Sequence, residues 1–109
     1  MKTERSYLRG VIAPEVHEWY IQQAAKHGTD LSDLHAEALE WFVGQLRKSS
    51  PSQRSVSILR APRTAKLVDA RVPEKVCTKV KKCSDDADIS VRQFVYSALT
   101  LYHAEHQGS

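Results

Sequence analysis

A pattern that occurs twice, about 60 residues apart, constrains the fold of this 109-residue chain more than any other feature. Each copy predicts one strand followed by two helices, and a stretch rich in Ser, Arg and Pro separates the copies. One strand and two helices, about 45 residues, are too few to close a hydrophobic core. Since the chain length fits one domain, we expect residues 1–109 to form a single domain of two repeats.

The second copy begins with LVDARVPE, residues 67–74. Strict alternation predicts a strand with one apolar side and one outward side that carries Leu67, Asp69 and Arg71. Apolar residues then return at helical spacing from Glu74 to about Asp86, and Ser90 is a good N-cap for the next helix. That helix is expected to bury Phe94, Ala98, Leu101 and Tyr102, with Val95 and Leu99 beside them.

The first copy repeats this order. Tyr7, Arg9 and Val11 would face outward if the residues between them face the core, and Pro14 opens a helix with the stripe Val16, Tyr20 and Ala24. Gly28 ends that helix, and Asp30 or Ser32 caps the next, which would bury Leu34, Ala38, Leu39, Trp41 and Phe42. A shift of 60 aligns the helices, but the prolines align at 59, which leaves the first strand's register open by one residue.

The formal net charge of +3 is unevenly distributed. Residues 1–46 hold four Lys and Arg against seven Asp and Glu, residues 47–66 hold six against none, and residues 67–109 hold six against six. The middle segment is therefore a basic linker, in which SVSIL (55–59) leaves open a short extra strand. No apolar run approaches the roughly 18 residues that span a bilayer, and we expect a cytoplasmic protein.

Motifs for catalysis, metals or cofactors are missing from the sequence. No Ser, His and acid cluster at motif spacing, no Gly-rich phosphate loop and no paired carboxylates on one helical face occur, so we expect no enzyme and no cofactor. His103 and His106 are spaced to share a metal, but two histidines near a helix end are usually surface residues, and we assign no metal site. Cys77 and Cys83, six apart on one helix, cannot pair; Cys83 belongs to the core stripe and Cys77 receives no role.

The stretches VDARVPEKV and ISVRQFVYSAL, in this order and duplicated, resemble ribbon-helix-helix DNA-binding proteins, the group of Arc, MetJ and the CopG-like plasmid repressors. The resemblance covers a first repeat at 6–46 and a second at 67–107, but not the linker at 47–66. In the family, strands from two subunits pair antiparallel into a ribbon. The resemblance implies a mainly α fold with one two-stranded antiparallel ribbon, an intramolecular pseudo-dimer of order β-α-α-linker-β-α-α.

The family inserts its ribbon into the major groove of double-stranded DNA, so the resemblance implies sequence-specific DNA binding. One chain would be a complete binding unit, and cooperative binding of neighbouring chains on DNA stays open. The outward residues would read bases: Tyr7, Arg9, Val11, Leu67, Asp69 and Arg71. Arginine suits guanine, aspartate can accept from cytosine, and apolar side chains suit the thymine methyl. Asp69 departs from the family's polar or basic pattern and could instead hold Arg9 or Arg71 in an ion pair.

Backbone phosphates would be held by the start of each second helix, where free N–H groups meet the positive end of the helix dipole. The second copy suits this role with Ser90, Val91 and Arg92, whereas Ser32 in the first copy lies between Asp30 and Asp33. Linker residues Arg60, Arg63 and Lys66 add salt-dependent contacts or merely keep the loop soluble. Because the two strands differ, the target need not be palindromic.

Three biological roles stay open. Tandem chains of this type resemble accessory factors of conjugative DNA transfer in bacteria, the TraY-type relaxosome proteins and the Vir-system protein that helps to process T-DNA borders. A transcriptional repressor of its own operon would use the same DNA contacts. An antitoxin-like module would instead grip a protein, for which Trp19, off the first helix's apolar stripe, could be exposed.

Overall fold

The structure, a computed structural model, describes residues 5–48 and 63–107. Two strands and four helices follow one another in the order β1, α1, α2, β2, α3, α4 within these residues. Their bounds are Arg5–Ile12 for β1, Pro14–His27 for α1, Leu31–Lys48 for α2, Lys66–Pro73 for β2, Glu74–Asp86 for α3 and Val91–Gln107 for α4. The predicted mainly helical fold with one pair of strands is therefore confirmed.

The strands β1 and β2 pair antiparallel and form a two-stranded sheet, as predicted. Arg9 lies opposite Asp69 at the centre, flanked by the pairs Tyr7 with Arg71 and Val11 with Leu67. Alternate residues of both strands are buried on the other side: Leu8, Gly10, Ile12, Val68, Ala70 and Val72. The predicted assignment of inward and outward faces is therefore confirmed for the middle of the sheet.

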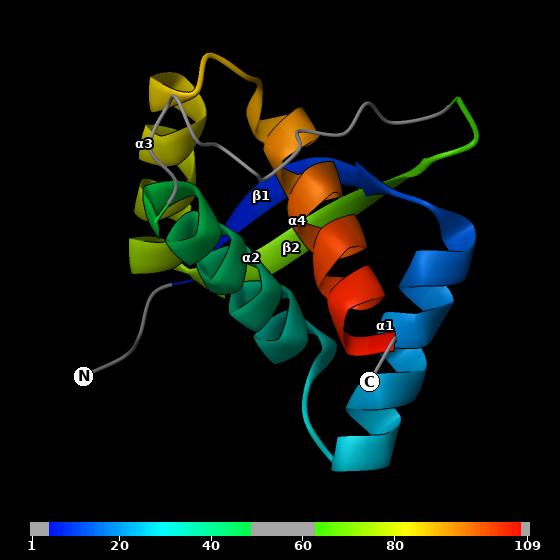
Figure 1. Cartoon of the computed structure of the whole chain (residues 1–109). Helices are drawn as coiled ribbons and strands as arrows, with labels where there is room; N and C mark the ends of the chain where they lie inside the picture. Colours follow the sequence, from blue (N-terminus) through cyan, green and yellow to red (C-terminus); the bar gives the residue numbers. More distant parts are fainter. Residues whose placement is uncertain (1–4, 49–62, 108–109) are drawn as a thin grey trace.

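The helices lie on one side of the sheet, as Figure 1 shows. The most extensive helix contacts with the sheet join α4 to β1 and α2 to β2, and α2 also packs against α4. Each second helix therefore rests on the strand of the other copy. Because of this exchange, the two copies share a single buried cluster.

An offset of 60 residues relates the starts of the helices and the residues that cap the first helix of each copy. The helices α1 and α3 begin 60 residues apart, and so do α2 and α4. After the first helix of each copy, Gly28 and Asp88 have positive φ angles of 64° and 59°. Their N–H groups donate to the carbonyls of Ala25 and Asp85 at 3.4 Å and 3.1 Å. The strands follow the same offset, since Leu8 and Gly10 are buried like Val68 and Ala70, and this settles the strand register that the prolines left open.

The prolines align differently because they occupy different places in the cap. Pro14 is the first residue of α1, where its missing N–H costs nothing, whereas Pro73 is the last residue of β2 and directly precedes α3. The two helices begin 60 residues apart, but the proline lies one residue earlier relative to the helix start in the second copy, which explains the spacing of 59.

Close packing of strand on helix depends on Gly10 in β1. A Cβ atom at this position would lie 2.5 Å from both Cβ and Cγ1 of Val95 in α4. Even a methyl group at position 10 would overlap Val95, so only glycine permits this close approach of β1 and α4. The second turn of α4 is thereby held against the middle of β1.

The core is polar on one side. Tyr20, His35 and Tyr102 are buried on this side. The equivalent positions, 60 residues away in each case, hold Val80, Val95 and Phe42, which are also buried. The Tyr20 hydroxyl donates to the Leu99 carbonyl at 2.8 Å, and the Tyr102 hydroxyl donates to the Glu37 carboxylate. Burial raises the pKa of both tyrosines. Polar side chains in this half thus join α1 and α2 to α4.

His35 is the least satisfied member of this polar half. The side chain is 2% exposed, its ring meets the Tyr20 ring edge-on, and Nε2 has no hydrogen-bond partner among the described residues. Burial, together with the charge of His17, lowers the pKa of His35 from 6.5 to about 4. The imidazole is therefore neutral at pH 7.

Several details differ from the sequence-based expectations. Cys77 is 3% exposed and belongs to the core, because it lies beside Val76 on the turn that meets the sheet. Helix α2 continues through Lys48, so the predicted linker begins two residues too early, and β2 begins at Lys66. The suggested strand at 55–59 lies outside the described residues.

Candidate nucleic-acid interface

The sheet turns five side chains away from the helices: Tyr7, Arg9, Leu67, Asp69 and Arg71. We call this set the outer face. All five are exposed, and Tyr7 and Leu67, at 64% and 68%, belong to the large hydrophobic residues that the described chain leaves in solvent. Such exposure has no folding benefit, since no helix of the described chain covers this side of the strands at these positions. The outer face is therefore the first candidate for a binding surface.

An ion pair occupies the centre of the outer face. Arg9 Nε lies 3.3 Å from Asp69 Oδ1, which confirms that Asp69 holds one of the strand arginines. The side chains remain 76% and 52% exposed, so solvent screens the pair and it adds little to stability. Its main effect is to orient the guanidinium on the sheet.

Arg71 differs from Arg9 in having no acidic partner. It is exposed opposite Tyr7, and no ion pair or hydrogen bond joins its side chain to another described residue. Tyr7, Arg9 and Asp69 border a shallow pocket of about 490 Å³ on the same side. The outer face thus combines one restrained guanidinium, one free guanidinium and a hollow between aromatic and charged groups.

Val11 is the one predicted outer-face residue that the structure does not expose. It is 2% exposed, although its cross-strand neighbour Leu67 is not covered. Three consecutive residues, Val11, Ile12 and Ala13, are buried where the chain leaves β1 and enters α1. The expected exposure of Val11 is wrong because the alternation of the strand ends one residue early.

The predicted phosphate contacts differ between the copies. Ser90 Oγ accepts a hydrogen bond of 3.1 Å from the Gln93 N–H, which confirms the N-cap of α4; Ser90 and Arg92 are exposed, and Val91 is half-buried. Ser32 is half-buried in the first turn of α2, next to the exposed Asp33. The start of α4 is therefore open and basic, whereas the start of α2 is acidic.

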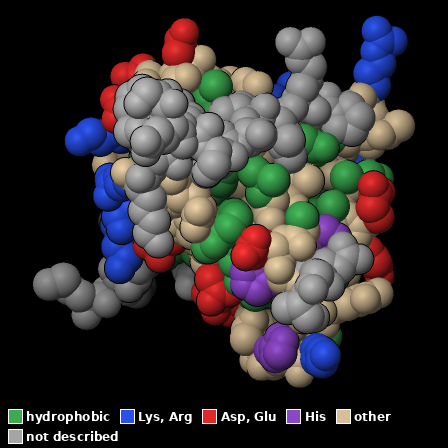
Figure 2. Space-filling model, viewed as in Figure 1, with side chains coloured by type: hydrophobic (Ala, Val, Ile, Leu, Met, Phe, Trp, Pro, Cys, Tyr) green, Lys and Arg blue, Asp and Glu red, His purple; other side chains and the backbone are tan. Residues whose placement is uncertain are grey.

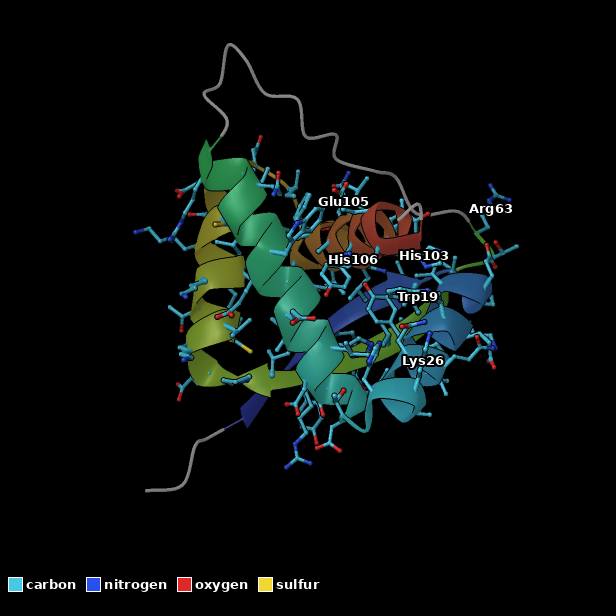
Figure 3. The ribbon with its side chains drawn as sticks, turned by 60° about the horizontal axis from the view of Figure 1, so that its bottom comes forward. Trp19, Lys26, Arg63, His103, Glu105 and His106 are labelled. Carbon is cyan, nitrogen blue, oxygen red and sulfur yellow. The ribbon has the colours of Figure 1, made fainter. Side chains whose placement is uncertain are left out.

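The basic residues before β2 are only partly described. Arg63 and Lys66 are exposed, and Figure 3 shows Arg63 beside the start of β2, apart from the ring cluster of α1 and α4. Arg60 lies outside the described residues. Two cations thus stand at the Leu67 end of the outer face.

The helical side carries a different surface. In Figure 2, Lys and Arg gather where α3 lies, and histidines gather where α1 meets the end of α4. Trp19 is half-buried there, with its ring 4.8 Å from that of His103, so the proposed exposure of Trp19 for a partner is not found. His106 stacks on Tyr102 at 3.9 Å.

Two pockets on the helical side occupy equivalent positions. One, of about 410 Å³, is lined by Gln23, Lys26, His27 and His106 among others; the other, of about 430 Å³, has Cys83, Asp86, Ala87 and Leu46 at the positions 60 residues away. Within the described part of the chain, no three metal-binding side chains come together.

Comparisons of the chain with family models, with curated proteins and with solved structures found no match. In the described residues, no helix is long and apolar enough to cross a membrane.

Proposed function

We propose that this chain binds double-stranded DNA by inserting its two-stranded sheet into the major groove, with the two copies acting as the halves of an intramolecular ribbon-helix-helix pseudo-dimer. The exposed outer face carries the proposal. A two-stranded ribbon fits the major groove, where each base pair presents a distinct set of donors, acceptors and methyl groups. Arg9, Arg71, Asp69 and the two apolar side chains match that set.

The contacts between the helices and the sheet support the pseudo-dimer. Each second helix packs on the other copy's strand, and the offset of 60 relates the helix starts and the cap residues Gly28 and Asp88. One chain then supplies what two subunits supply in the family. A complete binding unit would therefore form at any protein concentration.

Phosphate contacts would come chiefly from the second copy. The first turn of α4 offers backbone N–H groups and Arg92, while Arg63 and Lys66 stand at one end of the sheet. Cations of this kind release counterions from DNA and give affinity that falls with salt. Docking would be asymmetric, since the first turn of α2 carries Asp33 instead.

The biological setting follows from the resemblance alone. We place the chain among accessory factors of plasmid or T-DNA conjugative transfer, because those proteins carry the motif in tandem. A repressor role would use the same outer face at a different site.

Fluorescence anisotropy tests the proposal with a labelled random-sequence duplex titrated at several salt concentrations. We expect binding that weakens steeply with salt, and at least a tenfold loss in Arg9→Ala/Arg71→Ala. The control Lys81→Ala/Lys82→Ala removes the same charge from exposed positions of α3 and should lose much less. A folded protein that shows no binding at low salt, or equal losses in both variants, would contradict the proposal.

A further inference from the structure

The inward and outward positions of the sheet differ in how far the two copies agree. Inward, the equivalent pairs are Leu8 with Val68, Gly10 with Ala70 and Ile12 with Val72, all small or apolar. Outward, Arg9 corresponds to Asp69 and the buried Val11 to the exposed Arg71, and only Tyr7 and Leu67 are alike in being large and apolar. The fold requires small or apolar residues at the inward positions of both copies. The outward residues differ between the strands, so the two ends of this surface are not equivalent.

The centre of this directional surface is the pair of Arg9 and Asp69. They are equivalent by the offset of 60 and also lie directly opposite each other in the register. In two identical subunits, this central position would place a residue beside its own copy. Here it places a cation beside an anion, an arrangement that one chain with two different strands makes possible.

The ion pair leaves further hydrogen-bonding groups of both side chains available. Arg9 uses Nε toward Asp69 Oδ1 at 3.3 Å, and its two Nη groups and Asp69 Oδ2 make no hydrogen bond to another described residue. The guanidinium is a fixed fork of donors, and the carboxylate is an acceptor. Donors and acceptor therefore stand side by side, and both are in contact with solvent.

We propose that the Arg9–Asp69 ion pair reads one G·C base pair in a fixed orientation, so that the chain binds a non-palindromic duplex in one direction. This inference rests on the proposed function. In the major groove, guanine presents the O6 and N7 acceptors, and its partner cytosine presents the N4 amino donor. Arg9 supplies donors to guanine while Asp69 accepts from cytosine, and the reverse orientation would bring donors to donors.

The rest of the outer face distinguishes the two flanks of that base pair. Arg71 and Tyr7 lie on one flank, where a free guanidinium suits a second guanine. Leu67 lies on the other flank, where an exposed apolar side chain suits a thymine methyl. The flanks fix the direction of the whole complex, so the central guanine is assigned to one strand.

Selection from a library of random duplexes, followed by sequencing, tests this inference in three proteins. The first is the wild type, and the second, Arg9→Asp/Asp69→Arg, keeps the ion pair and the net charge but exchanges its ends. The third, Arg9→Ala/Asp69→Ala, removes the pair without changing the net charge. Both variants change only the exposed side chains of Arg9 and Asp69, and thermal unfolding confirms that each variant is folded.

We expect a wild-type motif with a central G·C pair and unequal flanks. The exchanged variant should prefer the opposite orientation of that base pair between the same flanks. In the wild type and in the exchanged variant, the preferred orientation should bind roughly five- to 150-fold more tightly than the other. The alanine variant should keep the flanks and the salt dependence but lose the central preference.

Two results overturn the inference in distinguishable ways. A palindromic motif, or the same central base pair in the wild type and the exchanged variant, shows that the ion pair does not read orientation while DNA binding itself stands. No enriched sequence, together with no salt-dependent binding of the random duplex, removes the proposed function and this inference with it.

Discussion

The two halves of the core have the same backbone arrangement and different chemistry. Val80, Val95 and Phe42 are apolar, whereas at the equivalent positions Tyr20, His35 and Tyr102 bring two hydroxyls and an imidazole into the interior. Buried polar groups are tolerated where hydrogen bonds compensate their desolvation. The tyrosines meet that condition with a carbonyl and a carboxylate, and His35 Nε2 does not.

The comparison separates what the repeated fold requires from what one half adds. Helix starts, C-terminal caps and inward strand residues agree between the copies. The polar side chains do not, and the Tyr20 bond to Leu99 reaches from the first copy into the second. We therefore expect the apolar half to depend on packing alone, and the polar half to depend also on pH and on individual hydrogen bonds.

The largest expected effect is that of pH on His35. The folded state lowers its pKa to about 4, below the ordinary 6.5, so its stabilising contribution is complete above about pH 6.5 and falls as the pH drops toward 4. Relative to His35→Val, which copies Val95, the wild type should lose on the order of 3 kcal/mol of unfolding free energy between pH 7 and pH 4. Urea unfolding at a series of pH values measures this difference.

A matched control is His27→Val, since His27 is exposed at the end of α1. This variant should keep the pH dependence of the wild type. If His35→Val also kept it, the imidazole of His35 would not be the group that makes the polar half sensitive to acid.

The next effect concerns the space between sheet and helix. Gly10→Ala places a Cβ atom 2.5 Å from Val95, although Ala70 occupies the equivalent position in the other strand. Overpacking of this kind should cost about 1–3 kcal/mol of unfolding free energy in chemical denaturation. Gly44→Ala is the control, because a Cβ there meets nothing within 4 Å, and it should stabilise α2 by about 0.5–1 kcal/mol. Equal stability of Gly10→Ala and Gly44→Ala would mean that β1 leaves as much space for a methyl group at position 10 as β2 leaves at Ala70.

A smaller loss is expected from Tyr20→Phe. The change removes only the hydroxyl that donates to the Leu99 carbonyl, so the expected cost is about 0.5–1.5 kcal/mol. Tyr7→Phe, an exposed hydroxyl on the outer face, should change the stability by less than about 0.5 kcal/mol. Thermal unfolding of both variants measures the two effects. A neutral Tyr20→Phe would show that the hydrogen bond to Leu99 does not stabilise the contact between the two copies.

Much of the fold could be predicted from the sequence because it depends on local signals. Alternation in LVDARV, proline before a charged helix, Gly28 and Ser90 mark element ends by backbone chemistry that needs no tertiary context. The ion pair of Asp69 could also be predicted, because the outward residues that can lie beside it on two strands are few and include two arginines.

The remaining features depend on contacts between distant segments. The period of α1 does not show that Trp19 packs against His103, nor does the alternation of β1 show that Val11 is buried. One signal could have identified His35, since the offset of 60 aligns it with Val95, a position expected beside the core stripe. The repeat itself predicts such sites better than the hydropathy of either copy.

The smallest effects should come from the two C-terminal caps, and they should differ in sign. Gly28 and Asp88 both have left-handed backbone angles, but only glycine adopts them without a steric cost. Gly28→Ala should therefore destabilise the protein by about 1 kcal/mol, although its Cβ would meet no atom within 4 Å. Asp88→Gly should stabilise it by a few tenths of a kcal/mol, since aspartate tolerates this conformation better than most residues but at some cost.

Denaturant unfolding of the two variants and of their combination measures both caps at once. Because the caps end different helices, the effects should add to within about 0.5 kcal/mol. A stabilising Gly28→Ala would show that the left-handed angle is not needed to end α1. A destabilising Asp88→Gly would show that the aspartate contributes more to the second cap than its backbone strain removes, so that the copies would differ in their caps as well as in their cores.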